Sequence, residues 1–382
     1  MPRGDEHGRA LTGDPSSGPQ GVFAHRAVEG FEQLAFCHDA ATGLQAIIAI
    51  HSTVLGPALG GTRFRPYATE ADAVADVCRL ARGMTYKHAV SGLDCGGGKA
   101  VILGDPRTLR SEALLRSYAR FIDGLAGRYL TAEDVGTTQA DMDLIRRETP
   151  YVTGVSEWLG GSGDPSPATA WGVLAALRTV GRRIWGSPSL SDRHIVVVGV
   201  GKVGRALVEH LLDEGARVTV ADVDPVAIET VVKEHGVATV EPAGAHALEC
   251  DVLSPCALGG VLNARTIPEL RCSAVCGSAN NQLETPADGQ RLADRGVLFA
   301  PDYVVSAGGV INIAEERTGL GYDRARARAR IEGIEATLAT VFDRADADGV
   351  TPEVAADRVA ENRIEAMAGV RRIRTSRPEP MA

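Results

Sequence analysis

Two lysines, Lys87 and Lys99, stand twelve positions apart, and three consecutive glycines at residues 96–98 precede the second. Glycine triplets are typical of places where a backbone turns sharply or comes close to another group, so we interpret this segment as a glycine-rich loop. The apolar run at 100–103 predicts a buried strand, with Lys99 partly desolvated at its mouth. Burial and a neighbouring cation both lower a lysine pKa towards neutrality, so Lys99 could act as a base beside Lys87. The alternative is two surface lysines around a flexible loop, and these residues alone do not decide between the two.

A carboxylate, Asp134, follows an apolar segment that begins at Tyr129 and runs into a polar turn. We predict a short strand here, which places Asp134 at its carboxyl end, a usual position for site residues in open α/β sheets. A solvated turn aspartate is the alternative. If the first interpretation holds, Asp134 is a second proton carrier beside the lysines.

A glycine motif lies further along, with Gly199, Gly201 and Gly204 between a β-branched strand at 194–198 and a helix. Asp222 follows eighteen residues after the last glycine, at the end of the next predicted strand. In that context the glycines let a pyrophosphate approach the helix N-terminus, and the aspartate accepts hydrogen bonds from the adenosine ribose hydroxyls. A 2′-phosphate would meet this carboxylate as a like charge, so the motif favours NAD over NADP. A purely structural strand–turn–helix unit is the alternative.

The elements that must position the lysines lie in the first part of the chain. We predict a hairpin about a turn at 39–43. A helix is predicted over 69–82, with Thr69 as its N-cap and Gly83 as its end. A further helix is predicted over 108–125.

A domain boundary is predicted at residues 160–167, which are rich in glycine, proline and serine and cannot hold regular structure. A chain of 382 residues suits two domains of ordinary size. Strand-like segments that recur after the boundary predict a doubly wound parallel sheet. They lie at 194–198, 217–222, 250–253, 274–276 and 297–300.

Composition argues against several functions. With 49 acidic and 40 basic residues the net charge is −9, the wrong sign for a protein that neutralises nucleic-acid phosphates. The chain has no apolar stretch of about eighteen residues, so we expect no membrane span. Its polar start lacks the apolar core of a signal peptide, and we expect a cytoplasmic protein. The seven cysteines show no CxxC spacing, so we expect them to be reduced and expect no metal site.

Taken together, the motifs resemble those of the glutamate/leucine/phenylalanine/valine dehydrogenase family, most closely its branched-chain (leucine and valine) members. The likeness runs in family order over about residues 30–320. The segments that carry it are PALGGTR (57–63), GMTYKHAVSGLDCGGGKAVI (83–102), TAEDVGTT (131–138), GGSGDPSPATAWGV (160–173), GVGKVG (199–204), PCALGG (255–260), GSANNQL (277–283) and APDYVVSAGGVIN (300–312).

The resemblance implies an α/β fold of two domains, an N-terminal α/β substrate domain and a Rossmann-type doubly wound NAD-binding domain, with the active site in the cleft between them. It also implies a homo-oligomer formed through the first domain. The expected bounds are a disordered tail at 1–22, a substrate and oligomerisation domain at 23–162 with C-terminal helices at about 335–370, and an NAD-binding domain at 163–334.

Carried over by residue, the resemblance makes Lys87 the partner of the substrate α-carboxylate, Lys99 the catalytic lysine and Asp134 the acid/base for the amino group. The other implied substrate contacts are Gly60, Gly61 and Asn281, with a side-chain pocket of Leu59, Ala132, Val310 and Ile313. The implied cofactor contacts are Gly199, Gly201, Lys202, Val203, Gly204, Asp222, Cys256, Ala257, Asn281 and, on the nicotinamide amide, Thr169.

The implied reaction is the reversible, NAD-dependent oxidative deamination of an amino acid to a 2-oxo acid and ammonia. Glutamate-specific relatives have a lysine at the position of Leu59, whereas all four pocket positions here are apolar. A glutamate side chain would therefore be buried without a partner. Ala132 and Ile313 leave a medium-sized cavity, which favours valine, leucine or isoleucine. Phenylalanine or another aromatic amino acid is the alternative.

Two residues within these motifs leave questions open. Relatives usually carry asparagine before Ala-Gly-Gly, where this chain has Ser306, a shorter side chain with one donor. This departure motivates a second hypothesis, a catalytically weak NAD-binding sensor. His88 is either a support for the site or a packing or exposed histidine.

Overall fold

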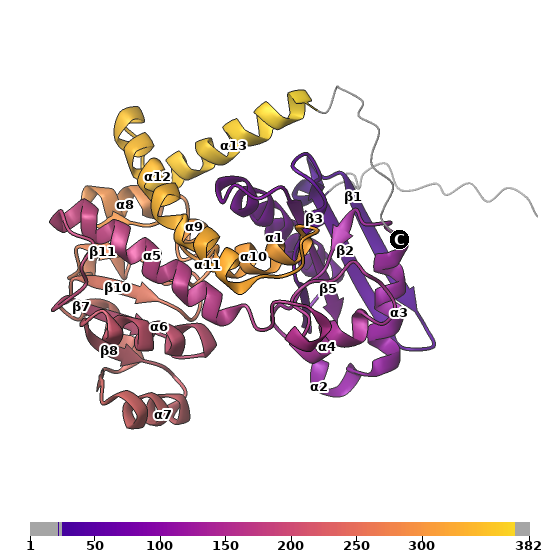
Figure 1. Ribbon diagram of the computed structural model, residues 1–382, viewed down its shortest axis with the longest axis horizontal. Helices are drawn as coiled ribbons and strands as arrows, with labels where there is room; N and C mark the ends of the chain where they lie inside the picture. Colours follow the sequence, from indigo (N-terminus) through magenta and orange to yellow (C-terminus); the bar gives the residue numbers. More distant parts are fainter. Residues whose placement is uncertain (1–21, 23–24, 371–382) are drawn as a thin grey trace, which may run out of the picture.

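The protein has two lobes, each built on a six-stranded sheet (Figure 1). The computed structural model describes residue 22 and residues 25–370, so the expected tail at 1–22 lies, except for its last residue, outside the described part. The α/β fold of two domains expected from the motifs is confirmed.

The first sheet is mixed, in the order β1-β2-β5-β3-β6, with β4 also paired to β5. Its strands are β1 (Gln33–Asp39), β2 (Leu44–Ser52), β3 (Ala58–Leu59), β4 (Thr62–Arg65), β5 (Gly96–Leu103) and β6 (Tyr129–Leu130). Its helices are α1 (Glu70–Val90), α2 (Pro106–Leu109), α3 (Glu112–Asp123) and α4 (Gln139–Ile145). The predicted hairpin is confirmed, because β1 and β2 pair antiparallel from Asp39↔Leu44 onwards.

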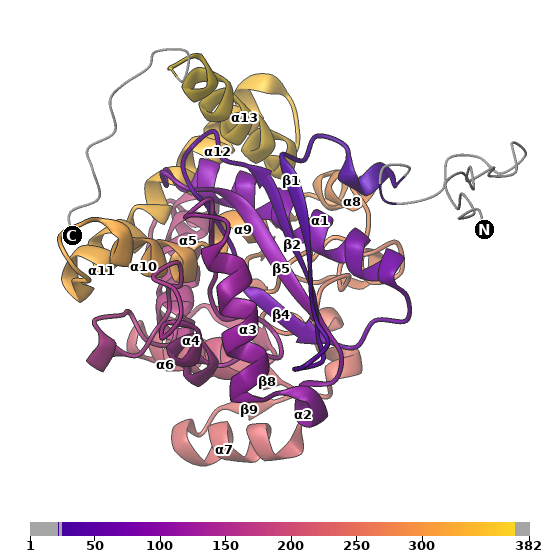
Figure 2. The same cartoon turned by 90° about the vertical axis from the view of Figure 1, so that its right-hand side faces the viewer.

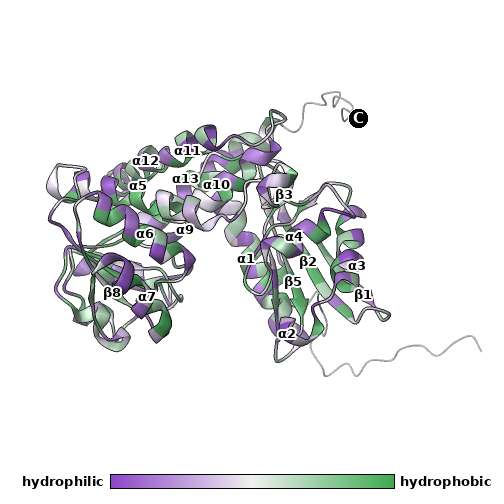
Figure 3. Ribbon diagram, turned by 60° about the horizontal axis from the view of Figure 1, so that its bottom comes forward, coloured by the Kyte–Doolittle hydropathy of each residue, from purple (hydrophilic) through white to green (hydrophobic). Residues whose placement is uncertain are grey.

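Helices α1 and α3 cover opposite faces of this sheet (Figure 2). Successive side chains of a strand point to opposite faces. Accordingly Ile47 and Val101 pack with the apolar side of α1, while Ile48 and Ile102 pack with α3. Figure 3 shows the hydrophobic colouring of β2 and β5 that results from burial on both faces.

Helix α1 does not end at Gly83, as its glycine had led us to predict, but continues to Val90. Its beginning is as predicted, with a capping box between Thr69 and Asp72. A glycine inside a helix costs only about 1 kcal/mol, and every residue from Lys87 to Val90 is buried, so packing outweighs the local preference. As a result Lys87 lies on a helix rather than in a loop.

The glycine triplet is also not a loop, because residues 96–98 form the first part of β5. A β-carbon at Gly97 would lie 2.0 Å from Thr85 Oγ1 and 2.3 Å from the Thr85 backbone nitrogen. One at Gly98 would lie 2.8 Å from the Tyr129 ring. The glycines therefore serve close packing of α1 and β6 on the strand, which is the other common reason for glycine in a strand.

The helix predicted over 108–125 is divided into α2 and α3. Arg110, the C-cap of α2, has extended backbone dihedrals. Ser111 then accepts a hydrogen bond from the Leu114 N–H at 3.2 Å and caps α3. This serine cap is a local start signal that the apolar periodicity alone did not reveal.

The second sheet is wholly parallel, in the order β12-β11-β10-β7-β8-β9. Its strands are β7 (His194–Val198), β8 (Arg217–Ala221), β9 (Ala238–Thr239), β10 (Val252–Pro255), β11 (Ala274–Val275) and β12 (Leu298–Phe299). The helices around it are α5 (Ser166–Trp185), α6 (Lys202–Asp213), α7 (Pro225–His235) and α8 (Ala287–Asp294). This order, with β7 in the middle, is the doubly wound sheet predicted from the strand segments.

The described part of the chain ends with five α-helices that reach both lobes. They are α9 (Asp302–Val305), α10 (Gly308–Ala314), α11 (Arg324–Glu332), α12 (Ile334–Asp348) and α13 (Pro352–Val370). Helix α12 packs on α5, whereas α13 packs on α1 (Figure 1). Arg363 of α13 donates to Leu93 O at 2.7 Å and to Asp94 Oδ1 at 2.8 Å, beyond the end of α1. The helix that carries Lys87 is thus held by the last described helix of the chain.

Short 3-10 helices complete the described secondary structure: η2 (Arg26–Val28), η3 (Glu157–Leu159), η4 (Pro242–Ala247), η5 (Ile267–Glu269) and η6 (Glu315–Arg317). Among the described residues, no helix is long and apolar enough to cross a membrane. The same residues contain no group of three or more histidine, cysteine or acidic side chains that could hold a metal ion.

The close packing of α1 on β5 gives a test. Gly97→Ala should lower the free energy of unfolding by about 1–3 kcal/mol, because its methyl group meets helix backbone that cannot move aside. Gly83→Ala is the matched control: it lies in the same helix region, and no atom of the described chain lies within 4 Å of the added carbon. It should stabilise by about 0.5–1 kcal/mol. Urea denaturation measures the free energy of unfolding of both variants. Equal changes in the two would contradict the inference that Gly97 is needed for close packing of α1 on β5.

Candidate active site

The centre of the site is an ion pair between Lys99 and Asp134. Lys99 Nζ lies 2.9 Å from Asp134 Oδ1, and the two side chains are 7% and 20% exposed. The other carboxylate oxygen, Asp134 Oδ2, accepts a hydrogen bond from Arg63 Nε at 2.9 Å. Both oxygens of Asp134 are therefore bound by cations. This excludes the alternative interpretation, a solvated aspartate in a turn.

These contacts shift the acidity of Asp134. Burial alone would raise the pKa of its carboxyl group, but the charges and hydrogen bonds of Lys99 and Arg63 outweigh burial and hold the pKa below its ordinary value. The group is thus an ionised acceptor in this state.

Lys87 reaches the same region from α1. Its Nζ donates a hydrogen bond to Ser306 Oγ at 2.9 Å, and the residue is 9% exposed. Burial lowers the pKa of Lys87 to about 8; the charge of Asp302 opposes this shift, and that of Lys99 adds to it. Ser306, the departure from the usual asparagine, therefore still contacts a site lysine.

Helix α9 brings a second carboxylate, Asp302, to this lysine. Asp302 and Ser306 lie one helical turn apart, and the Ser306 N–H donates to Asp302 O. Asp302 Oδ2 accepts a hydrogen bond from the Gln282 N–H at 2.8 Å. It thereby holds the loop in which Asn281 has a left-handed backbone, with φ of 54°. Burial raises the pKa of Asp302, against the effect of its backbone donors and Lys87.

Sequence reasoning missed Arg63 and Asp302 as site residues. Asp302 had a signal of the same kind as Asp134, an aspartate directly after an apolar strand-like segment. Arg63 ends the PALGGTR run, two positions after its glycines, and its partner is 71 residues away, so only the fold reveals the contact.

The four predicted pocket residues belong to one large apolar cluster. Leu59, Ala132 and Ile313 are buried in one apolar cluster, and Val310 packs against it. They come from β3, the segment after β6, and α10, so both lobes contribute. The same cluster continues into the core of the second lobe through α5.

Gly60 and Gly61 pack tightly beside these groups. A β-carbon at Gly60 would lie 1.8 Å from Gly98 O, and one at Gly61 would lie 2.9 Å from the Asp134 β-carbon. Gly60 donates its N–H to Leu130 O and accepts a hydrogen bond from the Tyr129 hydroxyl. Its backbone polar groups are therefore already used within the protein, whereas its lack of a side chain lets the strand of Lys99 approach.

The glycine motif has the form that a dinucleotide needs. Gly199 has φ of 103°, and a β-carbon at Gly204 would lie 1.9 Å from Gly199 O. Gly201 is the N-cap of α6; no side chain of the described chain caps this helix, and no described atom lies within 4 Å of a β-carbon at Gly201. Helix N–H groups thus face open space, which suits an anionic pyrophosphate.

The remaining predicted cofactor residues surround this helix terminus. Asp222 accepts hydrogen bonds from the Val200 N–H at 2.7 Å and the Asp224 N–H at 2.9 Å, which keeps its carboxylate beside the glycine loop. Cys256 and Ala257 border Gly199, since a β-carbon there would lie 2.6 Å from that of Ala257 and 2.9 Å from the Cys256 carbonyl carbon. Val203 packs against the apolar core.

Two predicted cofactor residues bind other groups. Lys202 lies 3.0 Å from Asp164 and 3.6 Å from Glu133, the neighbour of Asp134, so it connects α6 with the first lobe. The Thr169 hydroxyl donates to Pro165 O at 3.0 Å and faces Gly309. Of the two, Lys202 reaches the first lobe, whereas Thr169 contacts the start of α5 and α10.

His88 is a packing histidine within the site's support. It is fully buried, and its Nδ1 lies 2.8 Å from Gly96 O, so it joins α1 to β5. Burial lowers its pKa to about 4, which keeps it neutral.

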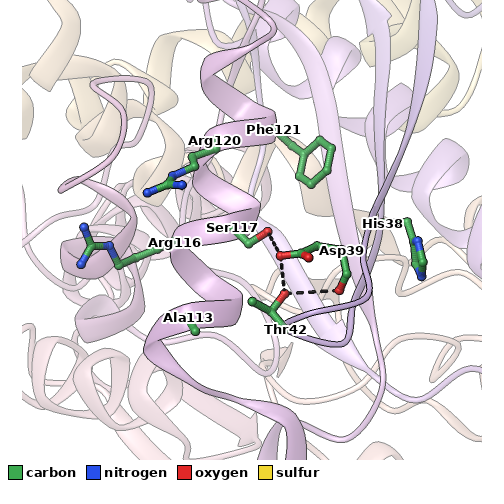
Figure 4. Close-up of a pocket in the computed structure, with 8 residues that line it drawn as sticks. All are labelled: His38, Asp39, Thr42, Ala113, Arg116, Ser117, Arg120 and Phe121. Carbon is green, nitrogen blue, oxygen red and sulfur yellow. Dashed lines mark hydrogen bonds between the residues drawn. The ribbon is translucent and has the colours of Figure 1, made fainter.

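A separate hollow of about 670 Å³ lies away from these residues, between the β1–β2 turn and α3. There Asp39 accepts hydrogen bonds from Ser117 and Thr42 (Figure 4). Neither lysine of the site lines this hollow, so it is distinct from the candidate active site.

Comparisons with known proteins agree with this geometry. Residues 32–151 match the family model described as Glu/Leu/Phe/Val dehydrogenase, dimerisation domain. Residues 160–371 match the model described as Glutamate/Leucine/Phenylalanine/Valine dehydrogenase.

Individual relatives match over nearly their whole length. A leucine dehydrogenase from Geobacillus stearothermophilus is 50% identical over 92% of this chain and 95% of its own. A valine dehydrogenase from Streptomyces albus is 51% identical over 93% of this chain and 97% of its own. The crystal structure of L-tryptophan dehydrogenase from Nostoc punctiforme superposes with a TM-score of 0.77, at 42% identity over 91% of this chain and 99% of that one.

The resemblance inferred from the sequence motifs is thereby confirmed. The chain belongs to the glutamate/leucine/phenylalanine/valine dehydrogenase family and is a pyridine-nucleotide-dependent amino acid dehydrogenase.

Proposed function

We propose that this enzyme catalyses the reversible, NAD-dependent oxidative deamination of a branched-chain L-amino acid. The amino acid, NAD⁺ and water give the 2-oxo acid, ammonium, NADH and a proton. The observation that carries the proposal is the Lys99–Asp134 contact, with the buried cation Lys87 nearby and four apolar residues gathered from both lobes.

Binding of the amino acid rests on Lys87. A buried ammonium group with Ser306 as its hydrogen-bond partner has further donors for the α-carboxylate, and the low polarity of its surroundings strengthens that ion pair. Asn281, held in its unusual backbone conformation beside Asp302, assists in orienting the same group.

Proton transfer rests on Asp134 and Lys99. Asp134, ionised because its pKa is held low, takes a proton from the substrate ammonium and leaves a neutral amine. Bound NAD⁺ supplies the acceptor for the Cα hydride, which leaves the substrate as an iminium ion. Lys99, in its unprotonated form, takes one proton from the water that attacks this carbon, which gives a carbinolamine. Asp134 then protonates the nitrogen, the C–N bond breaks, and the hydroxyl proton returns to Asp134 as the 2-oxo acid forms. Asp134 finally gives its proton to ammonia, and Lys99 releases its proton to solvent.

The cofactor residues favour NAD. The α6 N-terminus and the glycines Gly199, Gly201 and Gly204 would hold the pyrophosphate, and Asp222 would accept the ribose hydroxyls. A 2′-phosphate would approach the Asp222 carboxylate as a like charge, so NADP is disfavoured.

The pocket favours an aliphatic side chain. Leu59, Ala132, Val310 and Ile313 offer no partner for a second carboxylate, which would cost several kcal/mol to bury. Relatives about 50% identical are leucine and valine dehydrogenases, whereas the similar tryptophan dehydrogenase is 42% identical. An aromatic substrate is the second candidate. A sensor without turnover is the less favoured alternative, because Ser306, the residue that motivated it, still accepts a hydrogen bond from Lys87.

We also propose a cytoplasmic homo-oligomer formed through the first domain, with the domain bounds expected from the motifs. In the described sheet β1 is an edge strand, and its Phe36 is 54% exposed. Such an edge is available for pairing with a second copy. The family model over residues 32–151 is described as a dimerisation domain.

A substrate panel tests the function. With NAD⁺, the absorbance of NADH should rise with valine, leucine or isoleucine and stay at background with glutamate, because only the aliphatic chains fit the apolar pocket. NADP⁺ should give a kcat/KM at least about tenfold lower, from one like-charge contact. Turnover on phenylalanine or tryptophan alone would establish the second candidate, and silence with every amino acid would refute the proposal.

Removal of the catalytic amine gives a second test. Lys99→Ala should lower kcat by about 10²–10⁴-fold, since it removes the group that accepts the proton of water. Lys233→Ala, on the exposed face of α7, is the matched control and should keep wild-type kinetics. Initial rates measure both variants, and full turnover in Lys99→Ala would disprove this mechanism.

The buried charge of Lys87 should lower the free energy of unfolding, although the same charge serves to bind substrate. Its pKa of about 8 lies below that of a lysine in the unfolded chain, so below pH 8 the folded state keeps a charge that burial disfavours. At pH 7 the free energy of unfolding of Lys87→Met should therefore be about 1–3 kcal/mol higher than that of the wild type. Its KM for the amino acid should rise, because the partner of the carboxylate is lost.

The pH dependence of stability tests whether removal of the buried charge causes the higher free energy of unfolding of Lys87→Met. Between about pH 8 and 10.5 the folded wild type has released this proton and the unfolded chain has not, so wild-type stability rises and the gap closes. Denaturant titrations across this range measure the gap, with Lys233→Met as control. If the difference in free energy of unfolding between Lys87→Met and the wild type did not change with pH, better packing of methionine would be its cause instead.

A further inference from the structure

The position of Arg63 follows from strand register. Strand β4 pairs parallel with β5, with Arg63 opposite Val101. Lys99 and Val101 are two residues apart on β5, so their side chains share a face, and Arg63 lies on that face as well. The fold therefore places one cation on each side of the Asp134 carboxylate.

Arg63 is held on its far side too. Its Nη1 lies 3.0 Å from Asp76 Oδ2 on α1, and Asp76 also accepts hydrogen bonds from Tyr67 at 2.9 Å and Arg79 at 2.8 Å. The Arg63 side chain is 17% exposed. Its guanidinium thus bridges two carboxylates and has little freedom to leave Asp134.

The two cations on Asp134 differ in what they can do. A lysine can exchange its proton during a reaction, whereas an arginine stays charged and binds through fixed N–H groups. In the proposed reaction Lys99 has to turn towards water, so its bond to Oδ1 is broken and remade. The bond from Arg63 to Oδ2 can persist throughout.

This reasoning rests on the proposed deamination. We propose that Arg63 is a positioning residue for that reaction: it keeps Oδ2 of Asp134 bound and leaves Oδ1 to exchange a proton with the substrate amine. Without Arg63 the carboxylate could rotate, and either oxygen would compete for Lys99.

Arg63 also affects the charge of Asp134. The cations of Lys99 and Arg63 hold the pKa of the Asp134 carboxyl below its ordinary value against the effect of burial. The other titratable groups around it are Lys87 on α1, Tyr129 on β6, the adjacent Glu133 and, through Glu133, Lys202 on α6. Arg63 is the permanent cation in direct contact, so its loss should make Asp134 harder to ionise.

Three variants test the role. Arg63→Gln removes the charge, Arg63→Lys keeps a charge but cannot bridge Asp134 and Asp76 in the same way, and Arg79→Gln is the matched control. Arg79 contacts the same Asp76 and is 54% exposed, but it makes no contact with Asp134 among the described residues.

Steady-state kinetics from about pH 3.5 to 10.5, a range that includes the acidic limb of a carboxyl group with a low pKa, together with NAD⁺ titration, give the readout. Arg63→Gln should lower kcat at least about tenfold and move the acidic limb of the kcat/KM profile upward by about one pH unit. Arg63→Lys should restore most of the limb position but not the full kcat. Arg79→Gln should match the wild type within twofold, and NAD⁺ affinity should be unchanged in all three.

An activity-independent measurement separates this inference from the proposed function. Carbon-13 NMR of enzyme labelled at the aspartate carboxyl, with Asp134→Asn to assign the signal, should show Asp134 titrating at higher pH in Arg63→Gln than in the wild type. A wild type inactive on every amino acid would refute the function while this titration still decides the role of Arg63. If the Asp134 titration or the pH profile is unchanged in Arg63→Gln, or if Arg79→Gln shows the same shift, the inference is wrong.

Discussion

Helix α1 can lie as close to strand β5 as it does only because Gly97 has no side chain. A β-carbon at Gly97 would lie 2.0 Å from Thr85 Oγ1, which is a steric clash with the helical turn that precedes Lys87. This contact fixes the height of α1 above the sheet, and with it the position of the Lys87 ammonium relative to Lys99. His88 secures the same contact from the other direction through Gly96 O. The placement of both lysines therefore depends on a strand segment that consists of glycines.

The second constraint is that the site is completed across the two lobes. Lys87 on α1 meets Ser306 after α9, and Lys202 on α6 meets Glu133 beside Asp134. The continuous apolar cluster that includes the pocket residues supports these polar links, because it contains residues of both lobes. Glu316 adds a further connection by accepting hydrogen bonds from the Gly154 and Ser162 N–H groups. The residues proposed to bind substrate and those proposed to bind cofactor are therefore linked through contacts between the two lobes.

The parts that could be predicted from sequence are those whose evidence is local. The glycine motif and Asp222 lie within one strand–helix–strand unit, so spacing alone indicated their arrangement. The resemblance indicated separate roles for Asp134 and Lys99 but not their ion pair, because that contact depends on how β6 and β5 are ordered in the sheet. The end of α1 was mispredicted at Gly83, since burial of the next turn outweighs a glycine's preference. Arg63 was missed because its bridge to Asp76 and Asp134 requires three separate elements to meet.

The arrangement of charges supports the proposal that this site binds an amino acid. Three cations, Lys87, Lys99 and Arg63, lie among three carboxylates: Asp134 contacts Lys99 and Arg63, Asp76 contacts Arg63, and the charge of Asp302 acts on Lys87. Within the described chain the Lys87 ammonium forms its hydrogen bond to the neutral hydroxyl of Ser306, whereas Lys99 and Arg63 contact carboxylates directly. In the proposed reaction the substrate carboxylate would pair with the Lys87 ammonium, and the substrate ammonium would face Asp134. The low pKa of Asp134 keeps this carboxyl group in the form that can accept a proton. Under this proposal, recognition of the carboxylate and activation of the amine would both follow from one arrangement of charges.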